Sequence, residues 1–335
     1  MRSLSVFHGT RVFAWVKFGL CFLMLACAVG LFTIMVGLSM LASPVLGWFM
    51  FVLWLILCVL VGFFFYQRVL IKWNAAHICA MMRCYTTGKF DPDMFYKEQQ
   101  ASRKRFHNAG GYFKLHRTVL HAIAQQQRYF ETVTDDMEDV PGMKTLLRIG
   151  KYLEHLMLRF LADGCMGYIC WCEDLSVFAA AKEAVAVYAY NWRRLTEKAG
   201  EMSAVMVSAT VILSAGAAVG LSALFGVMKL NAYIYLAVLL GIALIFVLKY
   251  AFLESYYTCR MMKALLDNAQ DTVLSDGLYH RLQRVSKSYH YLCKTADRVA
   301  SDRKKRLDAA KQKALPSGSK EQRNAHQKTV RTTRR

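Results

Sequence analysis

Residues 18–66 read FGLCFLMLACAVGLFTIMVGLSMLASPVLGWFMFVLWLILCVLVGFFFY and contain no Asp, Glu, Lys, Arg or His. A helix of 49 residues would be roughly 73 Å long, whereas the hydrocarbon core of a bilayer is roughly 30 Å thick. The stretch must therefore fold back on itself. Ser43-Pro44 supplies the break, because proline has no backbone N–H and biases the preceding residue away from helical geometry. The pattern predicts membrane spans at about residues 18–42 and 44–66.

A second apolar stretch, residues 202–248, is interrupted only by Lys229. We expect Lys229-Leu230-Asn231 to form the turn between spans at about residues 202–228 and 230–252. The fold class predicted is all-α: a polytopic membrane protein with two transmembrane helical hairpins, hence four spans, and a helical cytoplasmic region between them. Its expected divisions are residues 1–73, 74–201, 202–253, 254–315 and 316–335.

Two other origins of these apolar stretches fit the sequence poorly. Buried helices of a soluble protein would show polar faces, and neither stretch has a polar stripe at a helical period. A cleaved signal peptide has a much shorter apolar core than the segment behind Arg11 and Lys17. The first helix can still act as an uncleaved signal anchor.

Charge predicts the orientation. Of the 43 Lys and Arg residues, 17 lie in residues 273–335, which hold only five Asp or Glu, while residues 41–46 carry no charge. Loops on the cytoplasmic side of a membrane are enriched in Lys and Arg. We therefore expect both short turns to face away from the cytoplasm, and both termini to lie inside.

The region between the hairpins is too long for a linker. Breakers such as Gly88 and Gly110-Gly111 suggest irregular or mixed structure over residues 73–113, followed by a helix over residues 113–130. Residues 143–161 form a strongly amphipathic pattern, whose basic face is Arg148, Lys151, His155 and Arg159. Such a helix either lies on the inner leaflet, with its cations on anionic lipid headgroups, or packs against the ends of the spans.

Residues 164–190 resemble a fifth span in composition. They also contain Glu173, Asp174, Lys182 and Glu183, each of which is costly at a bilayer centre. We expect a buried or interfacial helical segment there, re-entrant if other helices shield it. Residues 254–315 are predicted to be cytoplasmic helices, and residues 316–335 a basic disordered tail. The simplest partner for that tail is the anionic surface of the membrane and not nucleic acid.

Small residues recur along the third span at positions Ser214, Gly216, Ala218, Gly220 and Ser222. This spacing lets helix backbones approach closely in lipid, so a tight helix contact is expected. The pattern does not identify a substrate path.

The ten cysteines are scattered and are expected to be reduced thiols. Cys170-Trp171-Cys172 lacks the spacing and the second pair of a zinc site. The chain also lacks a glycine-rich phosphate loop, an HExxH motif and a nucleophile elbow. We expect neither an enzyme nor a resident metal or cofactor.

A series of short motifs runs through residues 150–270. The series is Leu153-Glu154, Tyr168-Ile169, Phe178, Ala181-Lys182-Glu183-Ala184-Val185, Asn191, Arg194, Asn231-Ala232-Tyr233, Gly241, Ala251-Phe252, Ser255 and Cys259. In order and spacing it resembles the C-terminal region of the choline transporter-like family. The resemblance implies a membrane transporter and leaves the roles of Tyr168, Phe178, Lys182, Asn191 and Arg194 unassigned. Members of that family are usually much longer, with further spans and a large extracellular loop.

Two functions follow as hypotheses. The first is transport of choline or a related small organic cation or amino alcohol, with a homo-oligomer supplying the spans that one chain lacks. The alternative is a non-transporting membrane scaffold or complex subunit that docks a partner through its cytoplasmic region and basic tail. It is motivated by residues 18–66 and 202–248, in which the polar residues that line a transport path are nearly absent.

Overall fold

The computed structural model describes residues 3–90, 93–132, 143–229 and 234–314, and every regular element in these ranges is helical. The apolar stretches form α2 (Arg11–Phe32), α3 (Leu38–Ala42), α4 (Pro44–Phe65), α10 (Trp192–Val227) and α11 (Ile234–Leu248). Three short π-helical segments continue these helices: η1 (Thr33–Gly37), η2 (Tyr66–Leu70) and η4 (Lys249–Leu253). The other helices form what we call the body: α1 (Ser3–Gly9), α5 (Ile71–Thr87), α6 (Met94–Phe106), α7 (Ala109–Thr132), α8 (Met143–Trp171), α9 (Val177–Tyr190), α12 (Glu254–Gln270), α13 (Asp276–Val285) and α14 (Lys287–Ala314).

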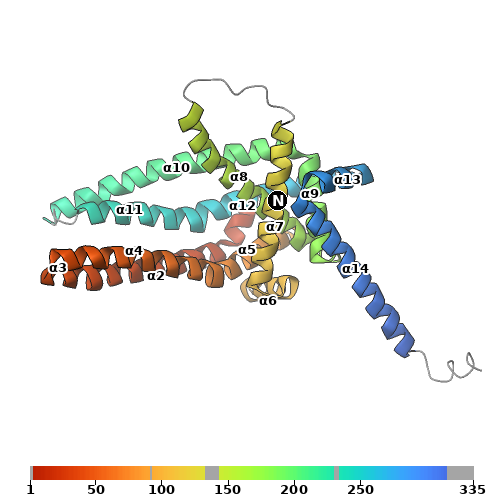
Figure 1. Cartoon of the computed structure of the whole chain (residues 1–335), viewed down its shortest axis with the longest axis horizontal. Helices are drawn as coiled ribbons and strands as arrows, with labels where there is room; N and C mark the ends of the chain where they lie inside the picture. The colour runs from red at the N-terminus through yellow and green to blue at the C-terminus, as the bar shows by residue number, and fades with distance from the viewer. Residues whose placement is uncertain (1–2, 91–92, 133–142, 230–233, 315–335) are drawn as a thin grey trace, which may run out of the picture.

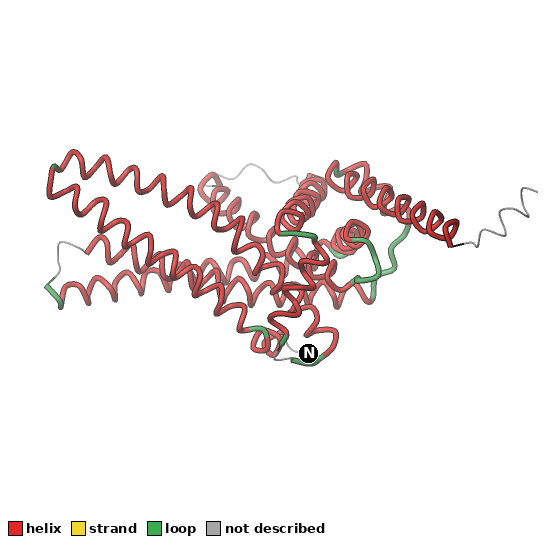
Figure 2. Tube along the Cα trace, turned by 90° about the horizontal axis from the view of Figure 1, so that it is seen from below, coloured by secondary structure: helices red, strands yellow, loops and turns green. Residues whose placement is uncertain are grey.

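Four helical segments of the described chain are long and apolar enough to cross a membrane: Arg11–Gly37, Pro44–Thr87, Trp192–Val227 and Ala237–Gln270. Helix α2 lies beside α4, α10 lies beside α11, and both pairs extend from the same side of the body (Figures 1 and 2). In the most apolar 18 residues of each segment, between 0% and 28% of the positions are buried. The apolar side chains therefore point outward, as membrane-spanning helices require. The chain has the helices of a multi-pass membrane protein.

The first pair breaks where proline predicts. Ser43 is extended, with φ −163° and ψ 136°, and α4 begins at Pro44. The pair is tied together by the indole of Trp54, whose Nε1 donates a hydrogen bond to the carbonyl of Ala28 at 2.9 Å. The ring of Phe32 packs edge-on against Trp54 at 5.1 Å.

In the second pair, the backbones of α10 and α11 approach each other closely at Gly241 of α11. A Cβ atom on Gly241 would lie 2.9 Å from the carbonyl oxygen of Ala217 in α10. Of the small residues that the sequence singles out, Ser214, Ala218 and Ser222 are half-buried. Gly216 and Gly220 are exposed and have open space where a Cβ would be.

The second helix of each pair does not end with its apolar stretch. Helix α4 runs through η2 into α5 as far as Thr87, and α11 runs through η4 into α12 as far as Gln270. Residues 73–113, expected to be irregular or mixed, are mostly helical, since α5 and α6 fill most of this range. The breakers end helices, as at Gly88 with φ 70°, without preventing helices between them.

Helix α8 is the centre of the body and packs against α5, α7, α9, α10 and α12. Its apolar face includes Leu156, Phe160 and Leu161, all buried in the core. In the described side chains, from Tyr152 to Leu161, the apolar face of this amphipathic pattern contacts protein.

Residues 164–190 are largely helical, as predicted, and are not among the four apolar segments; positions 164–170 are buried, whereas Glu173 and Asp174 are exposed. They form the end of α8, a turn, and α9, which buries Ala184–Ala189. Arg105 of α6 holds the turn, because its guanidinium donates to four main-chain carbonyls, those of Ile169, Cys172, Glu173 and Leu175, at 2.6–3.2 Å.

Residues 254–314 are helical as predicted, with Ser286 separating α13 from α14. Helix α14 extends from the body on the side away from the apolar pairs (Figure 1). The predicted disordered tail, residues 316–335, lies outside the described residues.

Candidate functional site

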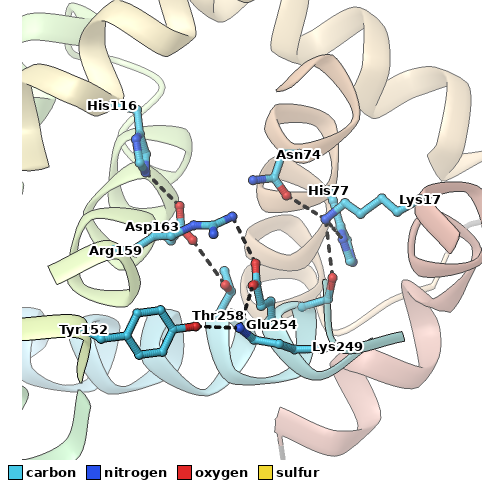
Figure 3. Close-up of polar contacts among 11 residues, drawn as sticks. Lys17, Asn74, His77, His116, Tyr152, Arg159, Asp163, Lys249, Glu254 and Thr258 are labelled. Carbon is cyan, nitrogen blue, oxygen red and sulfur yellow. Dashed lines mark hydrogen bonds and ion pairs between the residues drawn. The ribbon is translucent and has the colours of Figure 1, made fainter. Parts of the chain in front are cut away.

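Polar side chains, most of them buried or half-buried, collect where the apolar helices enter the body (Figure 3). We call this group the junction cluster; its members are Lys17 from α2, Asn74 and His77 from α5, His116 from α7, Tyr152, Arg159 and Asp163 from α8, Lys249 from η4, and Glu254, Ser255 and Thr258 from α12. The cluster joins helices from both apolar pairs to α8, the centre of the body.

Lys17 is 3% exposed and has a hydrogen-bond acceptor for each of its three N–H groups. Its Nζ lies 2.6 Å from Oδ1 of Asn74, 3.0 Å from Nδ1 of His77 and 3.4 Å from Oγ of Ser255. All three acceptors are neutral groups. None of the hydrogen bonds of this buried ammonium goes to a carboxylate.

The orientation of His77 follows from these contacts. Because Nδ1 accepts from Lys17, Nε2 carries the proton and donates to Oγ1 of Thr10 at 3.2 Å. Thr10 in turn donates to the carbonyl of Val6 at 3.0 Å, and Phe13 stacks on the imidazole at 5.2 Å. This chain of contacts connects α1 to the first apolar pair.

Glu254 is the acidic partner of two cations. Its Oε2 lies 3.0 Å from Nη2 of Arg159, and its Oε1 lies 3.9 Å from Nζ of Lys249. The same ammonium donates to the hydroxyl of Tyr152 at 3.1 Å and lies 5.8 Å and 5.5 Å from the ring centroids of Tyr152 and Phe246. Glu254 is five positions after Lys249, and the wider π turn of η4 brings the two side chains nearer to one face than an α-helix would.

Asp163 is 4% exposed and is held by hydrogen bonds from two helices. His116 Nε2 donates to Oδ1 at 2.9 Å, and Thr258 Oγ1 donates to Oδ2 at 3.4 Å. Burial alone would raise the pKa of this carboxyl, but the His116 hydrogen bond and the nearby cations outweigh it and lower the pKa.

The cluster is packed closely. The cavity between its side chains has a volume of about 10 Å³, which is room for about one water molecule. A choline-sized cation does not fit there. In this conformation the cluster can hold the apolar helices to the body, and it cannot enclose an organic substrate.

Most of the junction cluster lies outside what sequence reasoning identified. One signal was available: Lys17 is the last charge before the first apolar stretch, and Lys249 is the first charge after the second. Arg159, expected to face lipid headgroups, donates to Glu254. The side chains of Arg148 and Lys151 lie outside the described part of the structure.

The residues matched to the transporter family are spread over the body. Tyr168 is buried in α8, Phe178 packs against the core, and the Lys182 ammonium lies 5.1 Å from the ring centroid of Tyr279. Asn191 donates to Oγ1 of Thr272 at 2.8 Å, while Arg194 is exposed. None of these five side chains lines the junction cavity.

Comparisons with known proteins were made against family models, curated proteins and solved structures. Nothing matches in any of them. The resemblance to choline transporter-like proteins therefore stays a prediction from sequence motifs. Among the described residues, no three His, Cys, Asp or Glu side chains come together as a metal site would require.

Proposed function

We propose that this chain is a membrane-anchored docking protein whose helical body and basic C-terminal segment bind a partner in the cytoplasm. One observation carries the proposal. The charged residues of the four apolar segments all belong to their body ends, and the remaining parts are apolar and largely unburied. A path for a polar solute needs polar groups along the membrane depth.

The orientation rests on charge. Both apolar pairs fold back as hairpins in this proposal, with the uncharged turn at residues 41–46 and the turn at Lys229 on the outer side. The body and both termini then face the cytoplasm. Exposed cations of α14, Arg303 to Arg306, lie on the side away from the spans, where a soluble partner can reach them.

The docking proposal is tested by the mass of the native complex. Full-length protein is extracted from its membrane in mild detergent, and its complex is compared with that of the variant Arg303→Glu/Arg306→Glu. We expect the variant to run at a lower mass, approaching that of the chain alone. The control Arg103→Glu/Lys104→Glu reverses two exposed charges on α6 and should leave the mass unchanged. An unchanged mass for the α14 variant would contradict docking through this helix.

The second candidate is transport of a small organic cation, and a different observation favours it. The Lys249 ammonium lies near two aromatic rings and a carboxylate, which are the groups that recognise an alkylammonium ion. A rearranged cluster could offer these groups to a substrate. Uptake of labelled choline and ethanolamine into vesicles containing the purified protein tests this candidate, and saturable uptake above that of empty vesicles would support it. Uptake no greater than that of empty vesicles would exclude it.

A further inference from the structure

A basic groove of about 630 Å³ lies between α7 and the first turn of α14. Its walls carry the side chains of Lys114, Arg117, His121 and Lys287, together with Ser288 and Tyr291. No Asp or Glu is among the described residues that line it. Such a concentration of one sign of charge creates a positive potential that attracts an anion.

The amphipathicity of α7 produces one wall of the groove. Lys114, Arg117 and His121 follow at intervals of three and four residues, so they share one face of the helix. The opposite face, with Leu115, Val119, Ala122 and Ile123, is buried in the core. The basic face is therefore held in place by packing on the other side of the same helix.

Polar contacts fix the other wall. Gln125 of α7 accepts hydrogen bonds at Oε1 from Oγ of Ser286 at 2.8 Å and from the main-chain N–H of Ser288 at 3.1 Å. The Ser286 hydroxyl also accepts from the N–H of Tyr289 at 3.1 Å. These contacts hold the start of α14 against α7. They also occupy two amides of its first turn, so an anion in the groove would be bound by side chains.

Arg117 and His121 are arranged to act together. Arg117 Nε donates to Nε2 of His121 at 3.3 Å, so the imidazole carries its proton on Nδ1. The two Nη groups of the guanidinium and the imidazole N–H can then donate to a ligand. A guanidinium binds phosphate through two parallel hydrogen bonds, which a surface lysine alone cannot do.

We infer that this groove is a binding site for a phosphate monoester group. A monoester carries a charge of about −1.5 to −2 at pH 7 and three acceptor oxygens, which suits several converging cations better than a single carboxylate. Tyr291, 43% exposed, offers an aromatic surface to the rest of the ligand. The phosphate belongs either to a soluble ester or to a lipid headgroup. This site is separate from the proposed docking function and does not depend on it.

The experiment uses the full chain in nanodiscs of phosphatidylcholine, titrated with phenyl phosphate in a calorimeter. We expect one site per chain, with the dissociation constant raised about tenfold by Arg117→Gln and by Lys287→Gln, because each removes a charged hydrogen-bond donor. The matched control is Arg284→Gln, which removes one exposed charge from the neighbouring hollow lined by Tyr129, His280 and Arg281. It should change the constant less than twofold. The thermal unfolding of each variant is measured to show that it folds.

Further experiments distinguish a lipid headgroup from a soluble ester as the source of the phosphate group. Discs containing phosphatidylinositol 4-phosphate test the lipid source, and competition between this lipid and phenyl phosphate that is lost in Arg117→Gln would assign the site to a headgroup. Binding of phenyl phosphate alone would assign it to soluble esters. Three results would overturn the inference: no binding of either ligand, equal binding of benzoate and phenyl phosphate, or an equal loss in the Arg284→Gln control.

Discussion

Arg159 of α8 and Glu254 of α12 form an ion pair, with 3.0 Å between Nη2 and Oε2. Both side chains are mostly buried, with exposed fractions of 25% and 13%. Because Glu254 directly follows η4 and Arg159 belongs to the central helix of the body, the pair joins the second apolar pair of helices to the body. Lys249 is a second cation on the same carboxylate, at 3.9 Å.

Substitutions of Glu254 and of Arg159 should lower the free energy of unfolding by different amounts. Glu254→Gln leaves both Arg159 and Lys249 without their anion, and we expect it to lower the free energy of unfolding by about 3–5 kcal/mol. Arg159→Met should cost less, because Lys249 still compensates Glu254. Thermal unfolding of the purified variants in detergent measures the order, and a larger loss for Arg159→Met would contradict this account of the pair.

Lys17 should matter far more for stability than Lys72, an exposed lysine of α5. Lys17→Met removes the donor for the half-buried acceptor of Asn74 and the buried acceptors of His77 and Ser255, so a loss of about 1–3 kcal/mol is expected. Lys72→Met on α5 is the matched control, since Lys72 is exposed, and it should change stability by less than about 0.5 kcal/mol. Equal effects of the two substitutions would show that the buried contacts of Lys17 do not stabilise the fold.

The pKa of Asp163 predicts acid sensitivity. Its pKa is lower in the folded chain than the ordinary value of 3.8, so the carboxylate stabilises the fold above about pH 3.8. This contribution is lost as the pH falls below 3.8 through the folded pKa. Asp163→Asn should therefore be less stable than the parent at pH 6 and should lose less stability between pH 5 and pH 3. Parallel stability curves for the two proteins over this range would refute the assignment.

Because Gly241 lies in a close contact and Gly220 does not, substitutions of these two glycines by alanine should differ in their effect on stability. Gly241→Ala would place a methyl group 2.9 Å from the carbonyl oxygen of Ala217, and we expect a loss of about 1–3 kcal/mol as α10 and α11 move apart. Gly220→Ala has open space and serves as the control within one chain. If Gly220 contacts a second copy, Gly220→Leu will lower the oligomer mass in detergent without changing the stability of the monomer.

The sequence predicts the apolar helices well because their signal is local. An uncharged run longer than a bilayer is thick, with a proline in its middle, predicts two helices and the break at Ser43-Pro44. For residues 164–190 the sequence predicts a buried or interfacial helical segment instead of a span, because Glu173 and Lys182 would be costly at a bilayer centre. These inferences need only the neighbours of each residue in the chain.

The junction cluster could not be predicted in the same way. Lys17 contacts Ser255, which lies 238 positions away in the sequence, and Asn74, which lies 57 positions away. Which polar groups meet depends on how α2, α5 and α12 pack around α8. The continuation of α4 into α5 was missed for a related reason: in α5, packing of Ala76, Ile78 and Met81 into the core stabilises a helix that the sequence pattern only weakly favours.

Limited trypsin digestion of sealed vesicles of known orientation tests the central claim, that the apolar helices anchor a body which faces the cytoplasm. In vesicles with the cytoplasmic face outward, we expect rapid cleavage within Arg303 to Arg306, which are exposed on α14. In vesicles with the opposite orientation these sites should be protected, and the accessible site should be Lys229 at the end of α10. Cleavage within Arg303 to Arg306 from the outer face, with Lys229 protected, would contradict the account.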